Sequence, residues 1–158
     1  TYVGVYNNVC NSLIAAGLKG GMDITVVAPE PSSVVEDTPL RQQAEGAGRL
    51  RLSNDLRQAL KSSNAVYTDT WIDMEYFLDP AFAEEKERRL KLFQPYQINK
   101  ALLEGLDDLC VMHCLPAHRG YEIDGELTDD PRTIVFDQAE NRLHSQKAVL
   151  LQVAGKLP

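Results

Sequence analysis

Short apolar runs rich in β-branched residues alternate along the chain with longer segments in which apolar residues recur every three or four positions. Continuous apolar runs of this kind are typical of strands that are buried on both faces of a parallel sheet. We expect strands at Tyr2–Tyr6, Ile24–Ala28, Arg49–Leu52, Ala65–Asp69, Leu109–Cys114 and Thr133–Phe136.

Helical periodicity fills most of the intervals between these runs. We expect helices over Asn8–Lys19, Pro39–Glu45, Ser53–Leu60 with Ser53 as N-cap, Phe82–Phe93 and Glu140–Ala154, and a short helix or turn over Asn99–Gly105. Strands that alternate with helices predict βαβ units. The expected fold is therefore α/β, a single domain over residues 1–158 with a mainly parallel sheet and helices on both faces, in a three-layer, Rossmann-like arrangement.

Composition narrows the range of partners and compartments. The 158 residues carry a formal net charge of -7, which argues against nucleic acid as a partner. No apolar run approaches the ~20 residues of a membrane helix, so no membrane partner is expected. Three cysteines, an odd number, argue against a disulfide framework and favour a reducing, cytoplasmic location. The chain starts at Thr1 without Met or a signal peptide, which we interpret as the start of a piece of a longer protein.

Polar residues gather where the expected strands end. In a parallel sheet the carboxyl ends of the strands meet at one edge, which is the usual place for a ligand. Four strand ends deliver such groups to this edge: Asn7-Asn8, then Asp69 with residues 70–74, then residues 113–120, then residues 137–142. Their amides, carboxylates, thiol, imidazoles and guanidinium groups make this edge the expected functional site.

Each group also has a purely structural interpretation. Asn7 and Asn8 are equally suited to capping the first helix, and Asp69 to capping a loop. Cys110, Met112 and Cys114 alternate, as core residues of one strand do. Zinc is not expected, because in a strand His113 points away from Cys110 and Cys114 and no second pair of ligands exists. No glycine-rich phosphate loop occurs either, and we expect no metal and no cofactor.

Several of these segments resemble the motifs of ornithine carbamoyltransferases, within the aspartate/ornithine carbamoyltransferase superfamily. HCLPAHRG at 113–120 resembles the HCLPAxRG signature, and FDQAENR at 136–142 resembles the (D/E)-x-AENR segment. NNV and NSL at 7–13 resemble NNV-x-(H/N)-SL, YTDTW at 67–71 resembles YTDVW, and FQPYQIN at 93–99 resembles F-x-P-(F/Y)-Q-(V/I)-N. The matches are collinear and span nearly the whole chain.

The resemblance implies the half of such an enzyme that binds the amino acid. The other half, an N-terminal carbamoyl-phosphate domain with a Ser-x-Arg-Thr motif, is absent from this chain and is its implied partner, in an enzyme that is a homotrimer when full length. The implied reaction belongs to arginine biosynthesis. The side-chain amine of ornithine attacks carbamoyl phosphate, and citrulline and phosphate form without a covalent enzyme intermediate.

The resemblance also implies roles for individual residues. Asn8 and Asp69 would hold the α-carboxylate and the α-ammonium of ornithine. Cys114 and the Leu115 carbonyl would lie against the reacting amine and the carbamoyl group, and an expected cis Leu115-Pro116 bond would turn this carbonyl toward the site. Cys114 and Arg142 are the implied catalytic residues, and together with His113 they would form the carbamoyl-phosphate side of the site.

One loop departs from the family pattern. Where the family has Asp-x-x-x-Ser-Met-Gly, this chain has Asp69 followed by Asp73, Met74 and Glu75. Met74 matches and is an implied substrate-binding residue. Asp73 stands at the position of a substrate-binding Ser, so it either faces the amine or caps a helix. The loop therefore leaves two alternatives to ornithine transfer: a carbamoyltransferase for another amine, such as putrescine or N-acetylornithine, and a non-catalytic binding paralogue.

Overall fold

The sheet is parallel throughout. The computed structural model describes residues 1–30, 37–72 and 76–156, and within them five strands pair in the order β3-β2-β1-β4-β5. The strands are β1 Tyr2–Val3, β2 Ile24–Val27, β3 Leu50–Ser53, β4 Ala65–Thr68 and β5 Cys110–His113. The chain builds outward from β1 on one side and then returns to build outward from β4 on the other. The strand order therefore reverses between β1 and β4.

Helices cover both faces of this sheet, which confirms the expected fold class. The helices are α1 Asn8–Gly20, α2 Thr38–Gly46, α3 Leu56–Lys61, α4 Ala83–Phe93 and α5 Val135–Val153, with 3-10 turns η1 Pro80–Phe82, η2 Gln94–Tyr96 and η3 Gly125–Asp129. α1 and α2 pack on one face, over a core that includes Cys10, Ile14 and Ala44. On the other face α3 and the segment 98–127 bury Leu60 and Ile123.

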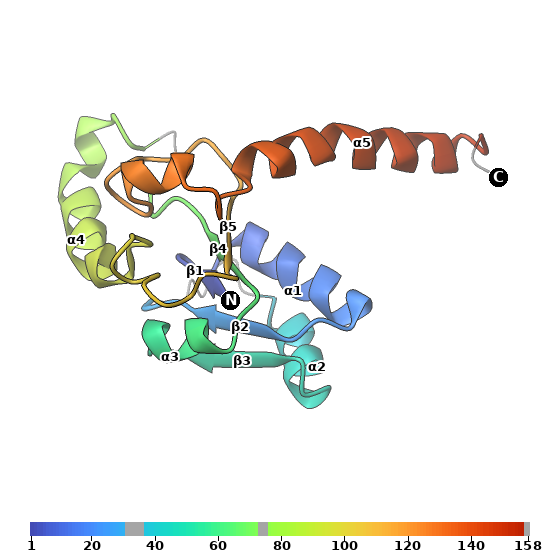
Figure 1. Cartoon of the computed structure of the whole chain (residues 1–158), viewed down its shortest axis with the longest axis horizontal. Coiled ribbons are helices and arrows are strands. Elements are labelled where there is room, and N and C mark those ends of the chain that lie inside the picture. The colour runs from blue at the N-terminus through green and yellow to red at the C-terminus, as the bar shows by residue number, and fades with distance from the viewer. Residues whose placement is uncertain (31–36, 73–75, 157–158) are drawn as a thin grey trace.

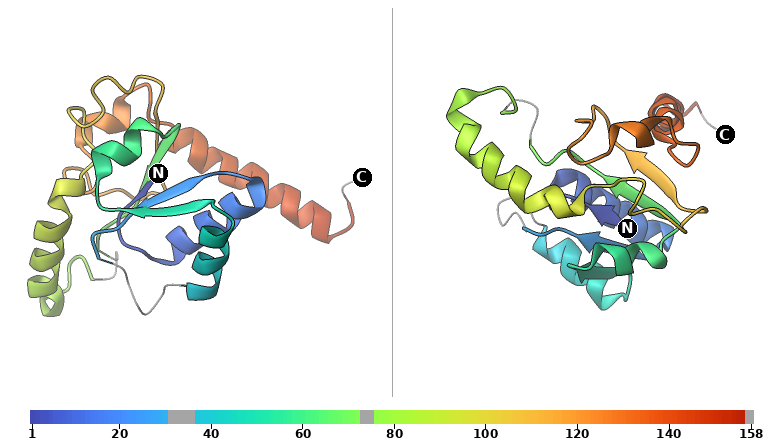
Figure 2. Two further views of the ribbon diagram at one scale, coloured as in Figure 1. Left: turned by 90° about the horizontal axis from the view of Figure 1, so that it is seen from below. Right: turned by 60° about the vertical axis from the view of Figure 1, so that its left-hand side comes forward.

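The remaining two helices lie at the edges of the sheet. Phe93 at the end of α4 packs against Trp71 and Ile72, which follow β4, so α4 lies beyond the carboxyl end of that strand (Figure 2). α5 begins beside β5 and then extends well away from the rest of the chain (Figure 1). Its outer part exposes large apolar side chains, among them Leu150 and Val153. No helix in the described residues is long and apolar enough to cross a membrane.

The expected strand at Thr133–Phe136 is wrong. Val111 donates its N–H to Arg132 O and accepts from Ile134 N–H, which makes a single bridge between Val111 and Thr133. The chain then turns directly into α5, which starts at Val135, before the expected start at Glu140. Val135 is buried in the first turn of the helix. A short apolar run has the same pattern in a buried helix as in a strand, and here the helix formed.

The expected helix start at Ser53 is also wrong. Ser53 is the last residue of β3, and Asp55 is the N-cap of α3, since its Oδ1 accepts from the N–H of Gln58 at 2.9 Å.

The segment Asn99–Gly105 is a series of turns. The Leu115-Pro116 peptide bond is cis, as expected.

Candidate functional site

The carboxyl ends of β1, β4 and β5 lie side by side at the point where the strand order reverses. Val3 is in register with Thr68, and Thr68 with His113. The next residues along these strands are Gly4, Asp69 and Cys114. An ideal Cβ on Gly4 would lie 3.5 Å from the Asp69 carbonyl oxygen, so the backbones that follow β1 and β4 approach closely here. A reversal point of this kind is where open α/β sheets bind ligands.

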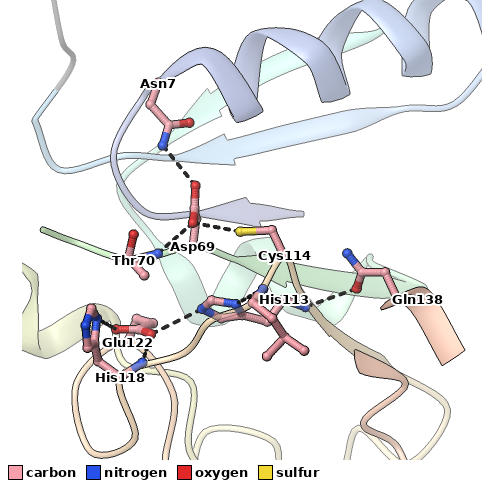
Figure 3. A network of polar contacts seen from close by, with 9 residues as sticks. Asn7, Asp69, Thr70, His113, Cys114, His118, Glu122 and Gln138 are labelled. Atoms are coloured by element: carbon pink, nitrogen blue, oxygen red, sulfur yellow. Dashed lines mark hydrogen bonds and ion pairs between the residues drawn. The ribbon is translucent and has the colours of Figure 1, made fainter. Parts of the chain in front are cut away.

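Asp69 is the centre of the polar network at this point. Its side chain is buried, and its Oδ2 accepts a hydrogen bond from Asn7 Nδ2 at 2.9 Å. Its Oδ1 accepts from the Thr70 N–H and from the Cys114 thiol, both at 2.8 Å (Figure 3). A buried carboxylate needs such partners, because burial without them is strongly unfavourable. The sequence-predicted grouping of the Asn7, Asp69 and Cys114 segments is confirmed by these contacts.

The Asn7 side chain caps α1 and also donates a hydrogen bond to Asp69. Its Oδ1 accepts from the N–H groups of Val9 and Cys10, which makes it the N-cap of α1, and also from the Tyr2 hydroxyl. Its Nδ2 is thereby directed at Asp69. The helix cap sets the orientation of the amide, and the amide in turn orients the carboxylate. The capping interpretation of Asn7 is correct, and it is compatible with a place in the site.

Cys114 is half-buried and acts as a hydrogen-bond donor. Burial, and then the adjacent Asp69, raises the pKa of its thiol to about 12. The thiolate, not the thiol, is the nucleophilic form of cysteine, so the raised pKa disfavours nucleophilic chemistry at Cys114 near neutral pH.

His113 points to the opposite side of β5 from Cys114. Its ring is fully buried beside Glu122, with Nε2 at 3.2 Å from Glu122 Oε1 (Figure 3). Its backbone N–H donates to Gln138 Oε1 at 3.2 Å, which ties the first turns of α5 to the end of β5. The fourth polar segment therefore reaches the site from a helix rather than from the predicted strand.

The other predicted residues lie around this network. Asn8 is exposed at the first position of α1, and Asn7 rather than Asn8 contacts Asp69. The Leu115 N–H donates to His113 Nδ1 at 2.8 Å. Arg142 is exposed on α5, four residues after Gln138 and so on the same side of the helix. Asp73 and Met74 lie outside the described residues.

The sequence interpretation missed Glu122 and gave Gln138 no role. Gln138 lies inside the AENR-like segment, so its position was a usable signal. Glu122 had none: it is buried because the chain around it returns to Ile98, whose N–H donates to the Glu122 carbonyl at 3.0 Å. No group of three or more His, Cys, Asp or Glu side chains in the described part of the chain could hold a metal ion.

Comparison with known proteins gives consistent matches. Residues 1–153 match the family model described as "Aspartate/ornithine carbamoyltransferase, Asp/Orn binding domain". The chain is 46% identical over 156 residues to the ornithine carbamoyltransferase of Archaeoglobus fulgidus, with 98% of this chain and 48% of the relative covered. It is 46% identical over 151 residues to the anabolic ornithine carbamoyltransferase of Pseudomonas aeruginosa, with 94% and 46% covered.

Solved structures agree. Ornithine carbamoyltransferase from Pyrococcus furiosus superimposes with a TM-score of 0.78 at 42% identity, covering 99% of this chain and 50% of that one. An N-acetyl-L-ornithine transcarbamylase gives 0.72 at 28% identity, covering 94% and 48%. The chain therefore spans about half the length of the relatives that it matches.

Proposed function

Because this chain belongs to the aspartate/ornithine carbamoyltransferase family as an Asp/Orn-binding domain, we propose that it is the ornithine-binding half of an ornithine carbamoyltransferase. The complete enzyme transfers the carbamoyl group of carbamoyl phosphate to the side-chain amine of ornithine and releases citrulline and phosphate. The observation that carries this proposal is the buried Asp69 carboxylate, held between Asn7 and Cys114 at the reversal point of the sheet.

Asp69 is suited to an α-ammonium group. A carboxylate can accept about four hydrogen bonds, and three donors already reach Asp69 from Asn7, Thr70 and Cys114. An incoming ammonium group supplies one further donor together with the opposite charge. The carboxylate is already oriented before the substrate arrives, so less conformational freedom is lost on binding.

Catalysis rests on positioning and on charge. The neutral side-chain amine of ornithine attacks the carbonyl carbon of carbamoyl phosphate, and phosphate leaves. Cys114 and the Leu115 carbonyl lie against the reacting amine, and Asn8 holds the substrate carboxylate. Arg142 stabilises the negative charge that develops on the carbonyl and phosphate oxygens. The half-buried Cys114 thiol contributes as a donor and a contact group, not as a nucleophile.

The partner of this domain is an N-terminal carbamoyl-phosphate domain of the same protein. The exposed apolar side chains of α5 support this, because a large apolar surface on an isolated unit usually marks a contact with another one. The complete enzyme is a cytoplasmic homotrimer that acts in arginine biosynthesis. The name "anabolic" of the Pseudomonas aeruginosa relative supports the biosynthetic direction.

The buried Asp69 carboxylate also bears on the two alternative functions, a carbamoyltransferase for another amine and a non-catalytic paralogue. N-acetylornithine carries no α-ammonium group, so it would leave the Asp69 carboxylate without a cation, and putrescine has no carboxylate for Asn8. The Asp73 substitution is the feature that favours such a different amine. A non-catalytic paralogue would have no need of the retained Cys114 and Arg142.

An assay of the complete protein with carbamoyl phosphate and a panel of amines tests the proposal. We expect the highest kcat/KM with ornithine, and no citrulline formation by the 158-residue chain alone although it is folded. A higher kcat/KM with putrescine or N-acetylornithine would select the alternative amine, and no turnover with any amine would select the paralogue. Citrulline formation by the chain alone would contradict the need for a second domain.

A further inference from the structure

A second buried carboxylate lies behind the site, on the other side of β5 from Asp69. Glu122 is fully buried, and its Oε1 accepts a hydrogen bond from the backbone N–H of His118. The same oxygen lies 3.2 Å from His113 Nε2, and the His113 ring is also fully buried. Burying a carboxylate is unfavourable unless it is well paired, so its presence here needs a reason.

The hydrogen bonds of His113 determine where its proton is. The Leu115 N–H donates to His113 Nδ1 at 2.8 Å, so Nδ1 carries no proton. We therefore assign the neutral tautomer with the proton on Nε2, which faces Glu122. Figure 3 shows the His113 ring between the end of the strand and the Glu122 carboxylate. The contacts form one chain, from Glu122 through the His113 ring to the Leu115 backbone.

This series of contacts ends at the Leu115 backbone, which has an unfavourable conformation. Leu115 has φ of 51°, in the left-handed region that a leucine rarely adopts. Cys114 lies in the sequence between His113 and Leu115, which are joined by the hydrogen bond from the Leu115 N–H to His113 Nδ1. Its thiol points to Asp69. The bond from Leu115 to His113 therefore holds the Leu115 backbone and, at the same time, the direction of Cys114.

We propose that Glu122 is a positioning residue of the amine site: by holding the His113 proton on Nε2, it keeps Nδ1 free to accept the Leu115 N–H and so places Cys114 and the Leu115 carbonyl. The role of that carbonyl rests on the proposed function. The link from Glu122 to His113 and Leu115 rests on the geometry alone.

The alternative states of His113 explain why a carboxylate is needed. If the proton moved to Nδ1, or if both nitrogens were protonated, Nδ1–H would face the Leu115 N–H and the two donors would repel. A carboxylate accepts from Nε2–H and cannot donate, so it selects the required tautomer. A glutamine at the same place can donate from its amide, which allows the opposite tautomer and releases Leu115.

The matched pair of variants is Glu122→Gln and Glu126→Gln. Glu126 is an exposed glutamate four residues later, paired with Lys100 at 2.8 Å, so its variant changes the same charge without touching His113. Both are made in the complete protein, alone and combined with His113→Gln. We expect Glu122→Gln to lower kcat with ornithine about 10-fold or more, with KM for carbamoyl phosphate within about twofold, and Glu126→Gln to leave both within about twofold.

The double variant separates positioning from general destabilisation. If Glu122 acts through His113, Glu122→Gln should have no further effect on kcat once His113→Gln is present. Two effects that multiply, or a kcat of Glu122→Gln within twofold of wild type, would overturn the proposal.

A second measurement does not depend on activity. Nitrogen-15 NMR of labelled histidine rings in the complete protein reports which nitrogen is protonated, and the signal missing in His113→Gln identifies His113. We expect the proton on Nε2 in wild type and a loss of that single tautomer in Glu122→Gln. A wild-type proton on Nδ1 overturns the proposal even if Glu122→Gln does not fold. If wild type turns over no amine, the proposed function fails while this measurement still decides the Glu122 link.

Discussion

The thiol of Cys114 lies 2.8 Å from Oδ1 of Asp69, although the two residues are 45 positions apart in the sequence. The contact exists because β4 and β5 pair in parallel and in register, so that their carboxyl ends meet. In the proposed function, Cys114 lies against the reacting amine and Asp69 binds the α-ammonium group. Substitutions at the two positions should therefore be non-additive, because each changes the surroundings of the other.

Cys114 should react slowly with iodoacetamide, because only the thiolate reacts. Burial and the adjacent Asp69 raise the pKa of Cys114 to about 12, so only a very small fraction of the thiol is ionised at pH 8. Asp69→Asn removes the neighbouring carboxylate, lowers the pKa of Cys114 and should speed the reaction. Peptide mapping after timed alkylation from pH 7 to 10 measures the rate, with Cys114→Ser identifying the peptide. A wild-type rate that levels off below pH 9 would contradict the raised pKa.

Asn7→Ala should destabilise the chain more than Asn8→Ala. Loss of the α1 cap typically costs about 0.5–2 kcal/mol, and Asn7→Ala also removes the donor to Asp69. Asn8 is exposed, so its alanine variant should stay within about 0.5 kcal/mol of wild type. Urea unfolding at pH 7 measures both changes, and equal losses would contradict the assignment of Asn7 as the cap.

Asn7→Asp separates the cap from the contact with Asp69. The new carboxylate still caps α1, but it stands beside Asp69 and the two like charges repel when both are ionised. One of the pair then has a raised pKa in the folded state, so this loss of stability is largest at neutral pH and shrinks as pH falls. Unfolding at pH 7 and pH 5 should show recovery for Asn7→Asp and none for Asn7→Ala.

Gly4→Ala should destabilise the chain through its backbone. Gly4 has φ of 146°, a conformation that costs about 1–3 kcal/mol for other residues, whereas the new Cβ itself would make only ordinary contacts. Gly46→Ala, at the end of α2 with open space around it, should instead stabilise by up to about 1 kcal/mol. Thermal unfolding of the two variants checks the signs, and a neutral Gly4→Ala would mean that the backbone relaxes.

Arg142→Ala should lower kcat/KM of the complete protein by roughly 100-fold or more, because a contact with charge in the transition state is lost. The stability of this chain should not change, since Arg142 is exposed on α5. Lys147→Ala, which removes another exposed cation from the same helix, is the control and should stay within about twofold. Similar losses in both variants would point to general electrostatics rather than to Arg142.

Asp73→Ser tests the two interpretations of the altered loop. If Asp73 faces the amine, the variant should change the ratio of kcat/KM between ornithine and putrescine or N-acetylornithine by ~1–3 kcal/mol, roughly 5- to 150-fold. If Asp73 only caps a helix, Ser replaces it with little change, because both are good caps. Competition assays of the complete protein decide, and ratios within about twofold support the cap.

The alternation of strands and helices could be predicted from the sequence because it depends on local periodicity. The grouping of Asp69 with Cys114 could be predicted as well, since parallel strands must bring their carboxyl ends to one edge. The run Thr133–Phe136 shows where this reasoning fails. Its apolar residues suit a strand or a buried helix turn equally, and in the folded chain Val135 is buried in the first turn of α5.

Only the tertiary structure decided which of two neighbouring residues contacts Asp69. Asn7 and Asn8 are the same residue type, and the direction of the chain entering α1 points the first at Asp69 and leaves the second exposed. Glu122 is the clearest case. A glutamate in a turn-rich segment is normally exposed, and nothing local distinguishes it from Glu126. It is buried against His113 because the chain folds back along Ile98, a contact between distant segments that no local pattern encodes.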